Sequence, residues 1–141
     1  MALNPYDQYR KTAVTTTSRA GQIIMLYDGL LRFTRQAVRA VERSELEDAH
    51  RNFLRAQDIL AELEASLDLE IGGDTAKNLL GLYEYGYRRL VEANCRKSAA
   101  PALEVITIFH ELLQAWREID GRASDTSTKQ VEQRELVGAH R

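Results

Sequence analysis

Apolar residues recur at alternating intervals of three and four between positions 46 and 67. They are Leu46, Ala49, Phe53, Ala56, Leu60, Leu63 and Leu67. This spacing places all seven side chains along one narrow stripe of an α-helix. Such a stripe is typical of the seam between nearly antiparallel helices in a bundle. The segment therefore predicts a fold in which further helices cover this stripe.

The rest of the chain offers helices of the right kind. Four are expected, at about residues 18–43, 44–68, 74–97 and 98–120. The third carries Ala76, Leu80, Tyr83, Tyr87, Leu90 and Asn94 at intervals of four and three. No stretch alternates apolar and polar residues as a half-buried strand does. Pro101 falls in the first turn of the fourth helix, where no intrahelical N–H is lost.

The expected helix ends carry residues that satisfy free backbone groups. Ser18 and Asp74 are suitable N-caps for the first and third helices. Ser44 and Glu47 have the spacing of a capping box at the start of the second helix. Gly121 is expected to end the fourth helix as a C-cap glycine.

The connections between the helices are short. Residues 43–44 and 96–98 leave room only for tight turns, and residues 69–73, which contain a glycine pair, form a slightly longer link. Short links make successive helices antiparallel. The prediction is an all-α, up-down-up-down four-helix bundle. It is flanked by a short N-terminal capping segment and linker over residues 1–17 and by a disordered, flexible C-terminal tail over residues 121–141.

Composition narrows the class of protein. A chain of 141 residues suits a single domain, and its net charge of −2 does not favour nucleic acid as a partner. No apolar run approaches the roughly 20 residues needed to cross a membrane. The lone Cys95 cannot form an internal disulfide, and the N-terminus lacks the charged-then-apolar plan of a signal peptide. These features indicate a cytoplasmic protein.

Catalytic and metal-binding patterns are incomplete. A di-iron site in a four-helix bundle needs two Glu-x-x-His motifs, and only Glu47 with His50 has this spacing. His110 and His140 lack it, and Cys95 has no histidine near it in sequence. No glycine-rich phosphate loop occurs. We therefore expect no catalytic residue, no metal and no cofactor. A helical-bundle enzyme or metal protein stays the alternative, which elemental analysis of the purified protein would decide.

The first helix has more apolar residues than one buried stripe needs. One face carries Ile23, Leu26, Leu30, Phe33, Ala37 and Val41, and a neighbouring face carries Ile24, Tyr27, Leu31 and Val38. A helix in a small bundle normally buries one stripe, so the second face is expected to need a partner. Tyr6 and Tyr9 lie three residues apart ahead of a polar linker and suit a detachable lid.

Several segments, in order along the chain, resemble the flagellin-specific export chaperones of bacteria, the FliS family. They are Asn4-Pro5-Tyr6 with Tyr9, Met25-Leu26-Tyr27-Asp28-Gly29, Arg55-Ala56-Gln57-Asp58-Ile59, Ser66-Leu67-Asp68 with Gly72-Gly73, Asn78-Leu79 with Leu82-Tyr83 and Tyr85, and Arg88-Arg89-Leu90 with Glu92-Ala93-Asn94. The chain departs from the family at Arg19, where proline is frequent, and at Gly86, where a bulky apolar residue is usual.

The resemblance implies a bundle that binds the disordered C-terminal segment of flagellin in the cytoplasm. Such a chaperone prevents premature polymerisation and delivers flagellin to the flagellar type III export apparatus. The resemblance also implies that the protein is not an enzyme and needs no nucleotide or metal. Neither nucleic acid nor membrane is an expected partner. A homodimer, weak or obligate, is left open, and light scattering over a concentration series would decide it.

The expected partner-binding residues combine the surplus apolar faces with the N-terminal tyrosines. They are Tyr6, Tyr9, Ile24, Tyr27, Leu31, Leu79, Leu82, Tyr83 and Gly86. On this hypothesis, Tyr27→Ala and Leu82→Ala weaken flagellin capture and leave the helical content intact. Periodicity alone does not say which apolar face is core and which is exposed.

Overall fold

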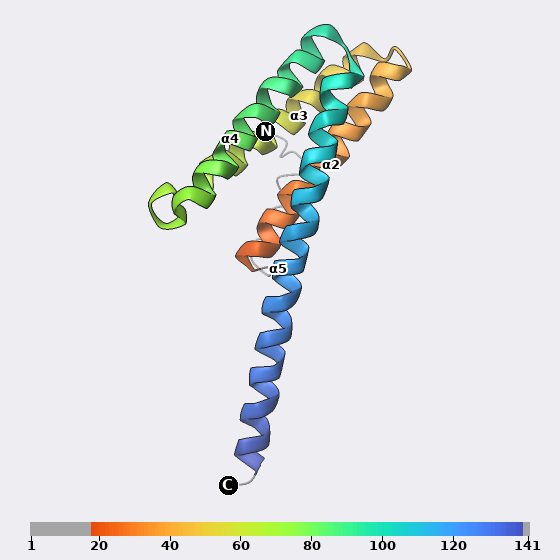
Figure 1. Ribbon diagram of the computed structural model, residues 1–141. Coiled ribbons are helices and arrows are strands. Elements are labelled where there is room, and N and C mark those ends of the chain that lie inside the picture. Colours follow the sequence, from red (N-terminus) through yellow and green to blue (C-terminus); the bar gives the residue numbers. More distant parts are fainter. Residues whose placement is uncertain (1–17, 140–141) are drawn as a thin grey trace, which may run out of the picture. The chain divides into compact units, whose positions relative to one another are not determined.

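The computed structural model describes residues 18–139, with side chains described from residue 18 to residue 121. Between residues 18 and 139 the backbone forms four helices and no strand (Figure 1). They are α2 (Arg19–Glu42), α3 (Leu46–Ala65), α4 (Leu69–Arg96) and α5 (Ala99–Ala139). The chain divides into two units, Met25–Leu112 and the two ends that flank it. The predicted cap and linker over residues 1–17 lies outside the described residues.

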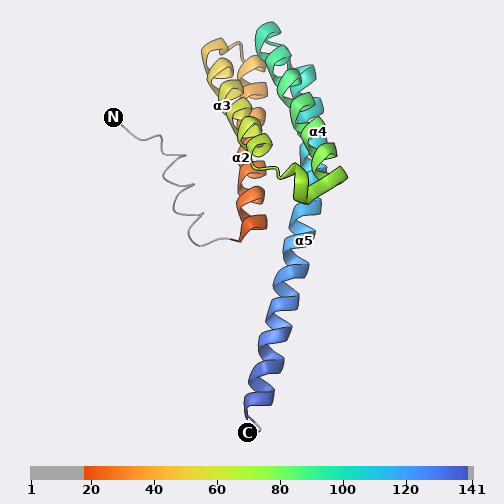
Figure 2. The same ribbon diagram turned by 90° about the vertical axis from the view of Figure 1, so that its left-hand side faces the viewer.

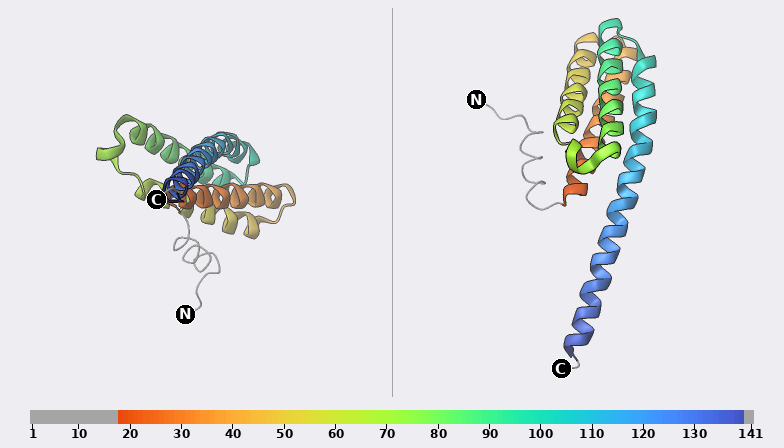
Figure 3. Two further views of the ribbon diagram at one scale, coloured as in Figure 1. Left: turned by 90° about the horizontal axis from the view of Figure 1, so that it is seen from below. Right: turned by 60° about the vertical axis from the view of Figure 1, so that its left-hand side comes forward.

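The unit Met25–Leu112 contains all of α3 and α4 and parts of α2 and α5. Successive helices run in opposite directions, which the colours show in Figure 2. α3 and α4 are neighbours and lie side by side in the right-hand view of Figure 3. The predicted all-α, antiparallel four-helix bundle is confirmed.

The described ends of the chain form the other unit. The N–H of Gly21 donates to Oγ of Ser18 at 3.1 Å, so Ser18 caps α2 as predicted. Oγ of Ser18 in turn donates to Oδ1 of Asp120 at 3.3 Å. The first described residue before α2 is therefore tied to the later part of α5.

The predicted capping box at Ser44 and Glu47 is wrong. Ser44 has a left-handed backbone (φ 58°), and α3 begins two residues later, after an N-cap residue, Glu45, whose side chain makes no capping hydrogen bond. The N–H of Ser44 donates to the carbonyl of Val41, and that of Glu45 donates to the carbonyl of Ala40. This pair of bonds is a Schellman motif that ends α2. Ser44 therefore closes the preceding helix and is not available to open the next.

The third helix begins five residues earlier than predicted. Asp68 accepts hydrogen bonds from the N–H groups of Glu70 (3.1 Å) and Ile71 (3.0 Å), so Asp68 is the N-cap of α4. The expected glycine break is present as a kink, because Gly73 has non-helical angles (φ 55°, ψ −134°). Asp74, the predicted cap, lies inside α4 just after this kink.

The predicted C-cap at Gly121 is also wrong, because α5 continues through it to Ala139. Gly121 does not have the positive φ of a C-cap glycine. Glycine inside a helix costs about 1 kcal/mol relative to alanine, which weakens a helix but does not end it. Pro101 lies in the first turn of α5, as predicted. The flexibility expected for residues 121–141 stays a prediction.

Candidate functional site

Three aromatic rings meet at the centre of the unit Met25–Leu112. Tyr27 from α2, Tyr83 from α4 and Phe109 from α5 have ring centroids 5.8 to 6.2 Å apart, and all three are buried. The hydroxyl groups of Tyr27 and Tyr83 are 2.7 Å apart and hydrogen bond to each other. Burial and the neighbouring tyrosine raise the pKa of Tyr83, so its phenol stays neutral. The cluster joins three helices through apolar contact and one satisfied polar pair.

Four of the predicted partner-binding residues belong to this core. Tyr27, Leu31, Tyr83 and Gly86 are all buried within the bundle. The expectation that these four line an uncovered face is therefore wrong. On α2 the physical reason is that a helix of this bundle contacts neighbours on two sides, so both of its apolar faces are core.

Gly86 lies at a position where the packing leaves no room for a side chain. A Cβ atom at this position would lie 2.8 Å from Cε2 of Phe109 and 3.4 Å from Cδ1 of Leu60. Contacts below 3.0 Å require something to shift. The ring of Phe109 therefore occupies the space that a bulky residue at position 86 would need.

The other predicted residues differ in exposure. Ile24, Leu79 and Leu82 are partly exposed, so each retains apolar surface. Leu79 and Leu82 lie three residues apart on α4 and share a side of that helix. Ile24 belongs to the unit formed by the chain ends. Tyr6 and Tyr9 lie outside the described residues.

An exposed apolar surface occurs on α3 and α4, at residues that the sequence prediction did not select. Leu54 is 42% exposed, and Tyr87 and Val91 are each 37% exposed. The side-chain amide of Asn94 and Nδ1 of His50 are within hydrogen-bonding distance (3.0 Å from Nδ2 and 3.3 Å from Oδ1 of Asn94), which aligns the two antiparallel helices. Leu54 follows His50 by one turn and Val91 precedes Asn94 by about one turn, so they lie at a similar level. We call Leu54, Tyr87 and Val91 the α3–α4 apolar face.

A signal for this face is present in the sequence. Leu54 and Val91 lie outside the three-four seams of their helices, each directly after a core residue, Phe53 or Leu90. Apolar residues that do not belong to the seam are expected to be exposed to solvent or to contact a partner. Tyr87 gives no such signal, because it fits the seam spacing and is nevertheless exposed.

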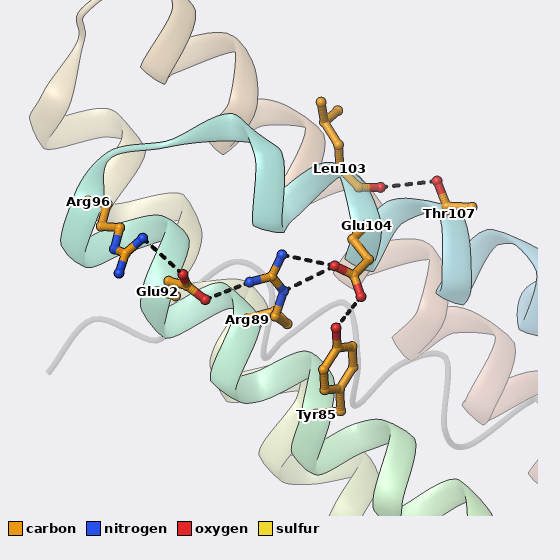
Figure 4. A network of polar contacts seen from close by, with 7 residues as sticks. All are labelled: Tyr85, Arg89, Glu92, Arg96, Leu103, Glu104 and Thr107. Atoms are coloured by element: carbon orange, nitrogen blue, oxygen red, sulfur yellow. Dashed lines mark hydrogen bonds and ion pairs between the residues drawn. The ribbon is translucent and has the colours of Figure 1, made fainter.

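A polar network joins α4 to α5 (Figure 4). Arg89 donates from Nε (3.1 Å) and Nη2 (2.9 Å) to Oε2 of Glu104, and the hydroxyl of Tyr85 donates to the other carboxylate oxygen. Arg89 also donates to Glu92 at 2.6 Å, and Glu92 pairs with Arg96 at 3.3 Å. The hydrogen bond from Tyr85 and those from Arg89 lower the pKa of Glu104, against the opposing effect of desolvation.

The network predicts a loss of stability in acid. Because the pKa of Glu104 is lowered on folding, its stabilising contribution is full above the unfolded-state value of about 4.3 and disappears as the pH falls through the lower folded-state value. Glu104→Gln should therefore destabilise the protein more at about pH 7 than at about pH 3. Urea unfolding followed by circular dichroism at both pH values measures this.

Glu111→Gln is the matched control, because Glu111 is an exposed glutamate on the same helix. Its effect on the free energy of unfolding should stay within about 0.5 kcal/mol, as is usual for an exposed position. A Glu104→Gln effect that is equally large at both pH values would contradict the electrostatic role of the network.

The described residues do not bring metal-ligating side chains together. Between residues 18 and 121 no group of three or more histidine, cysteine, aspartate or glutamate side chains is placed to hold a metal ion. Within the part of the chain that the structure describes, none of the helices has the length and apolar character required to span a membrane. Cys95 is exposed.

The fold and its exposed apolar face define a helical-bundle protein with surface suited to contact with another molecule. Residues 2–123 match the family described as Flagellar protein FliS. This match covers most of the chain, so the protein belongs to the FliS family. FliS is a chaperone family and not a class of enzymes.

Individual relatives agree with this assignment. The chain is 33% identical to the flagellar secretion chaperone FliS of Bacillus subtilis, over 82% of the chain and 85% of the relative. It is 35% identical to FliS of Campylobacter jejuni, over 81% of the chain and 89% of the relative. A crystal structure titled as a flagellar chaperone from bacteria has the same fold, with a TM-score of 0.70 at 16% identity over 83% of this chain and 95% of that one.

Proposed function

We propose that this protein is a cytoplasmic flagellar export chaperone. Its client is the disordered C-terminal region of flagellin, which it keeps from polymerising prematurely and delivers to the flagellar type III export apparatus. The names of the relatives support the chaperone role. The observation that carries client binding is the α3–α4 apolar face, because adjacent exposed apolar residues mark interaction sites more often than isolated ones do.

The proposed mode of binding is a helix laid on an apolar surface. A disordered client that folds on contact loses conformational entropy, which offsets part of the contact energy and keeps the complex releasable. The α3–α4 apolar face supplies the exposed contacts, and Leu79 and Leu82 remain proposed contacts on another side of α4. Ile24, in the unit formed by the two ends of the chain, remains a proposed contact with the client.

The buried predicted residues take a supporting role in this proposal. Tyr27, Leu31, Tyr83 and Gly86 hold α2 and α4 in the core, and so fix the surface that α4 presents. Tyr6 and Tyr9 are proposed to form a detachable lid over apolar client-binding surface, which the client displaces. A lid favoured by about 1.4 kcal/mol would weaken apparent client binding about tenfold.

Flagellin capture tests the proposal. Immobilised protein should retain full-length flagellin and lose flagellin that lacks about forty C-terminal residues, a few helical turns with their connectors. A double substitution, Tyr87→Asp with Val91→Asp, should weaken capture at least about tenfold, since it places two charges on the apolar face.

The matched control is Leu103→Asp with Thr107→Asp on α5. Leu103 and Thr107 are exposed and one turn apart, as Tyr87 and Val91 are. Equal loss of capture in both double variants would remove the α3–α4 apolar face from the client site. Retention of the truncated flagellin would contradict recognition of its C-terminal region. Light scattering of the unliganded protein distinguishes a homodimer that covers the same face.

A further inference from the structure

We propose that the exposed side of α2 is a docking surface for an acidic polypeptide segment. This surface is formed by Arg32, Arg35 and Arg39 of α2 with Arg55 of α3, and we call it the arginine stripe. The inference concerns charged residues that the proposed flagellin contact does not use. Its partner is recognised by carboxylate groups.

The stripe follows from the helical spacing of its residues. Arg32, Arg35 and Arg39 are separated by three and four positions, so their side chains leave one side of α2. At about 1.5 Å per residue, the stripe is roughly 10 Å long. All three residues are exposed and lie in the unit Met25–Leu112.

Arg55 adds a fourth charge from the neighbouring helix. The guanidinium carbon of Arg32 lies 5.1 Å from the centroid of the Phe33 ring, and that of Arg55 lies 5.5 Å from the same centroid. Phe33 is itself 7% exposed and therefore fixed in the core. Cation–π contacts therefore place both guanidinium groups against one immobile ring before any partner arrives.

The four arginines have no acidic partner among residues 18–121. The ion pairs formed there join Asp48 to Arg51 and link Arg89, Glu92, Arg96 and Glu104. Within this part of the chain no ion pair neutralises the stripe, although the chain as a whole has a net charge of −2. This local charge attracts an acidic partner.

The dimensions of the stripe favour a short acidic peptide over nucleic acid. Asp28 lies one turn before Arg32 and Glu42 lies one turn after Arg39, so negative charge limits the stripe at both ends. A long polyanion would also meet residues 58–74, which contain six acidic residues and no basic one. Arginine forms bidentate pairs with carboxylates, and carboxylates one helical turn apart match the spacing along α2.

A fluorescein-labelled peptide of about fourteen residues, roughly four helical turns, is a suitable probe. It carries glutamate at three- and four-residue intervals in an alanine background, and a second peptide has glutamine at the same positions. Fluorescence anisotropy at low salt should show at least about tenfold tighter binding of the glutamate peptide, and added salt should weaken it.

Two charge-reversed proteins locate the binding surface. Arg35→Glu with Arg39→Glu should weaken binding of the glutamate peptide at least about tenfold. Lys77→Glu with Arg88→Glu has the same net charge, places both changes at exposed positions of α4, and should bind as the unmodified protein does. If the first variant melts at a lower temperature, Arg35→Gln with Arg39→Gln replaces it and should also weaken binding.

Three results would overturn the proposal. Equal weakening in the α2 and α4 variants would show that only overall charge matters. Tighter binding of a single-stranded DNA of similar length would identify a nucleic-acid surface. Self-association that Arg35→Glu with Arg39→Glu abolishes would make a second copy of this chain the occupant. The protein with Tyr87→Asp and Val91→Asp should lose flagellin capture but still bind the glutamate peptide. This result would show that the two binding surfaces are independent, so that either proposal can fail without the other.

Discussion

Tyr27→Ala is expected to lower the free energy of unfolding by about 3–5 kcal/mol. Tyr27 is fully buried and contacts both Tyr83 and Phe109, so its removal leaves a cavity bounded by two aromatic rings. It also leaves the hydroxyl of Tyr83 without its partner at 2.7 Å, and a buried unpaired hydroxyl is costly. Urea unfolding followed by circular dichroism measures the loss. The variant therefore tests stability and does not isolate flagellin capture.

Two further variants separate the causes. Tyr27→Phe keeps the ring and removes only the hydroxyl, so it should cost about 1–3 kcal/mol through the unpaired hydroxyl of Tyr83. Leu103→Ala, at a position 49% exposed, should change the free energy of unfolding by less than about 0.5 kcal/mol. A Tyr27→Ala protein as stable as the Leu103→Ala protein would show that Tyr27 is not part of the core.

Gly86→Leu is expected to destabilise the protein by about 3 kcal/mol, at the upper end of the range for overpacked cores. The added Cβ alone would lie 2.8 Å from the ring of Phe109, and the rest of the side chain has no space between that ring and Leu60. Gly81→Leu is the matched control on the same helix. A Cβ at Gly81 meets nothing within 4 Å, so leucine there should stabilise α4 slightly through its higher helix propensity.

A double substitution tests the cause of this effect. If the ring of Phe109 is the obstacle, Gly86→Leu combined with Phe109→Leu should lose less stability than the sum of the two single losses. Such a coupling is typically about 0.5–3 kcal/mol for residues in contact. Additive losses would place the clash elsewhere. The pairing of glycine at 86 with phenylalanine at 109 would then need another explanation.

The fold was largely predictable because the seam residues are numerous and regular. Ala49, Phe53, Leu60 and Leu63 recur at core spacing, and all are buried. The ends of helices were harder, because a cap depends on backbone angles that composition does not specify. Ser44 resembles an N-cap in sequence, but its left-handed backbone makes it the end of α2.

The site was less predictable, because periodicity assigns residues to faces without saying what covers each face. Tyr27 and Leu31 suggest a surplus stripe on α2, yet both are buried by neighbouring helices. Leu54 and Val91 are conspicuous only once the core has been assigned. Tyr87 fits a seam and is nevertheless exposed, so the spacing of apolar residues alone does not assign it to the core or to the surface.

The paired tyrosine hydroxyls have a consequence for how the helices align during folding. Apolar stripes attract one another almost equally well when one helix slides past its neighbour by a turn. Such a slip would move Tyr27 about 5 Å from Tyr83. Both hydroxyl groups would then be buried in the apolar core without a hydrogen-bond partner. Only the correct alignment avoids this penalty. One polar contact therefore selects a single arrangement among several that bury the apolar side chains about equally well.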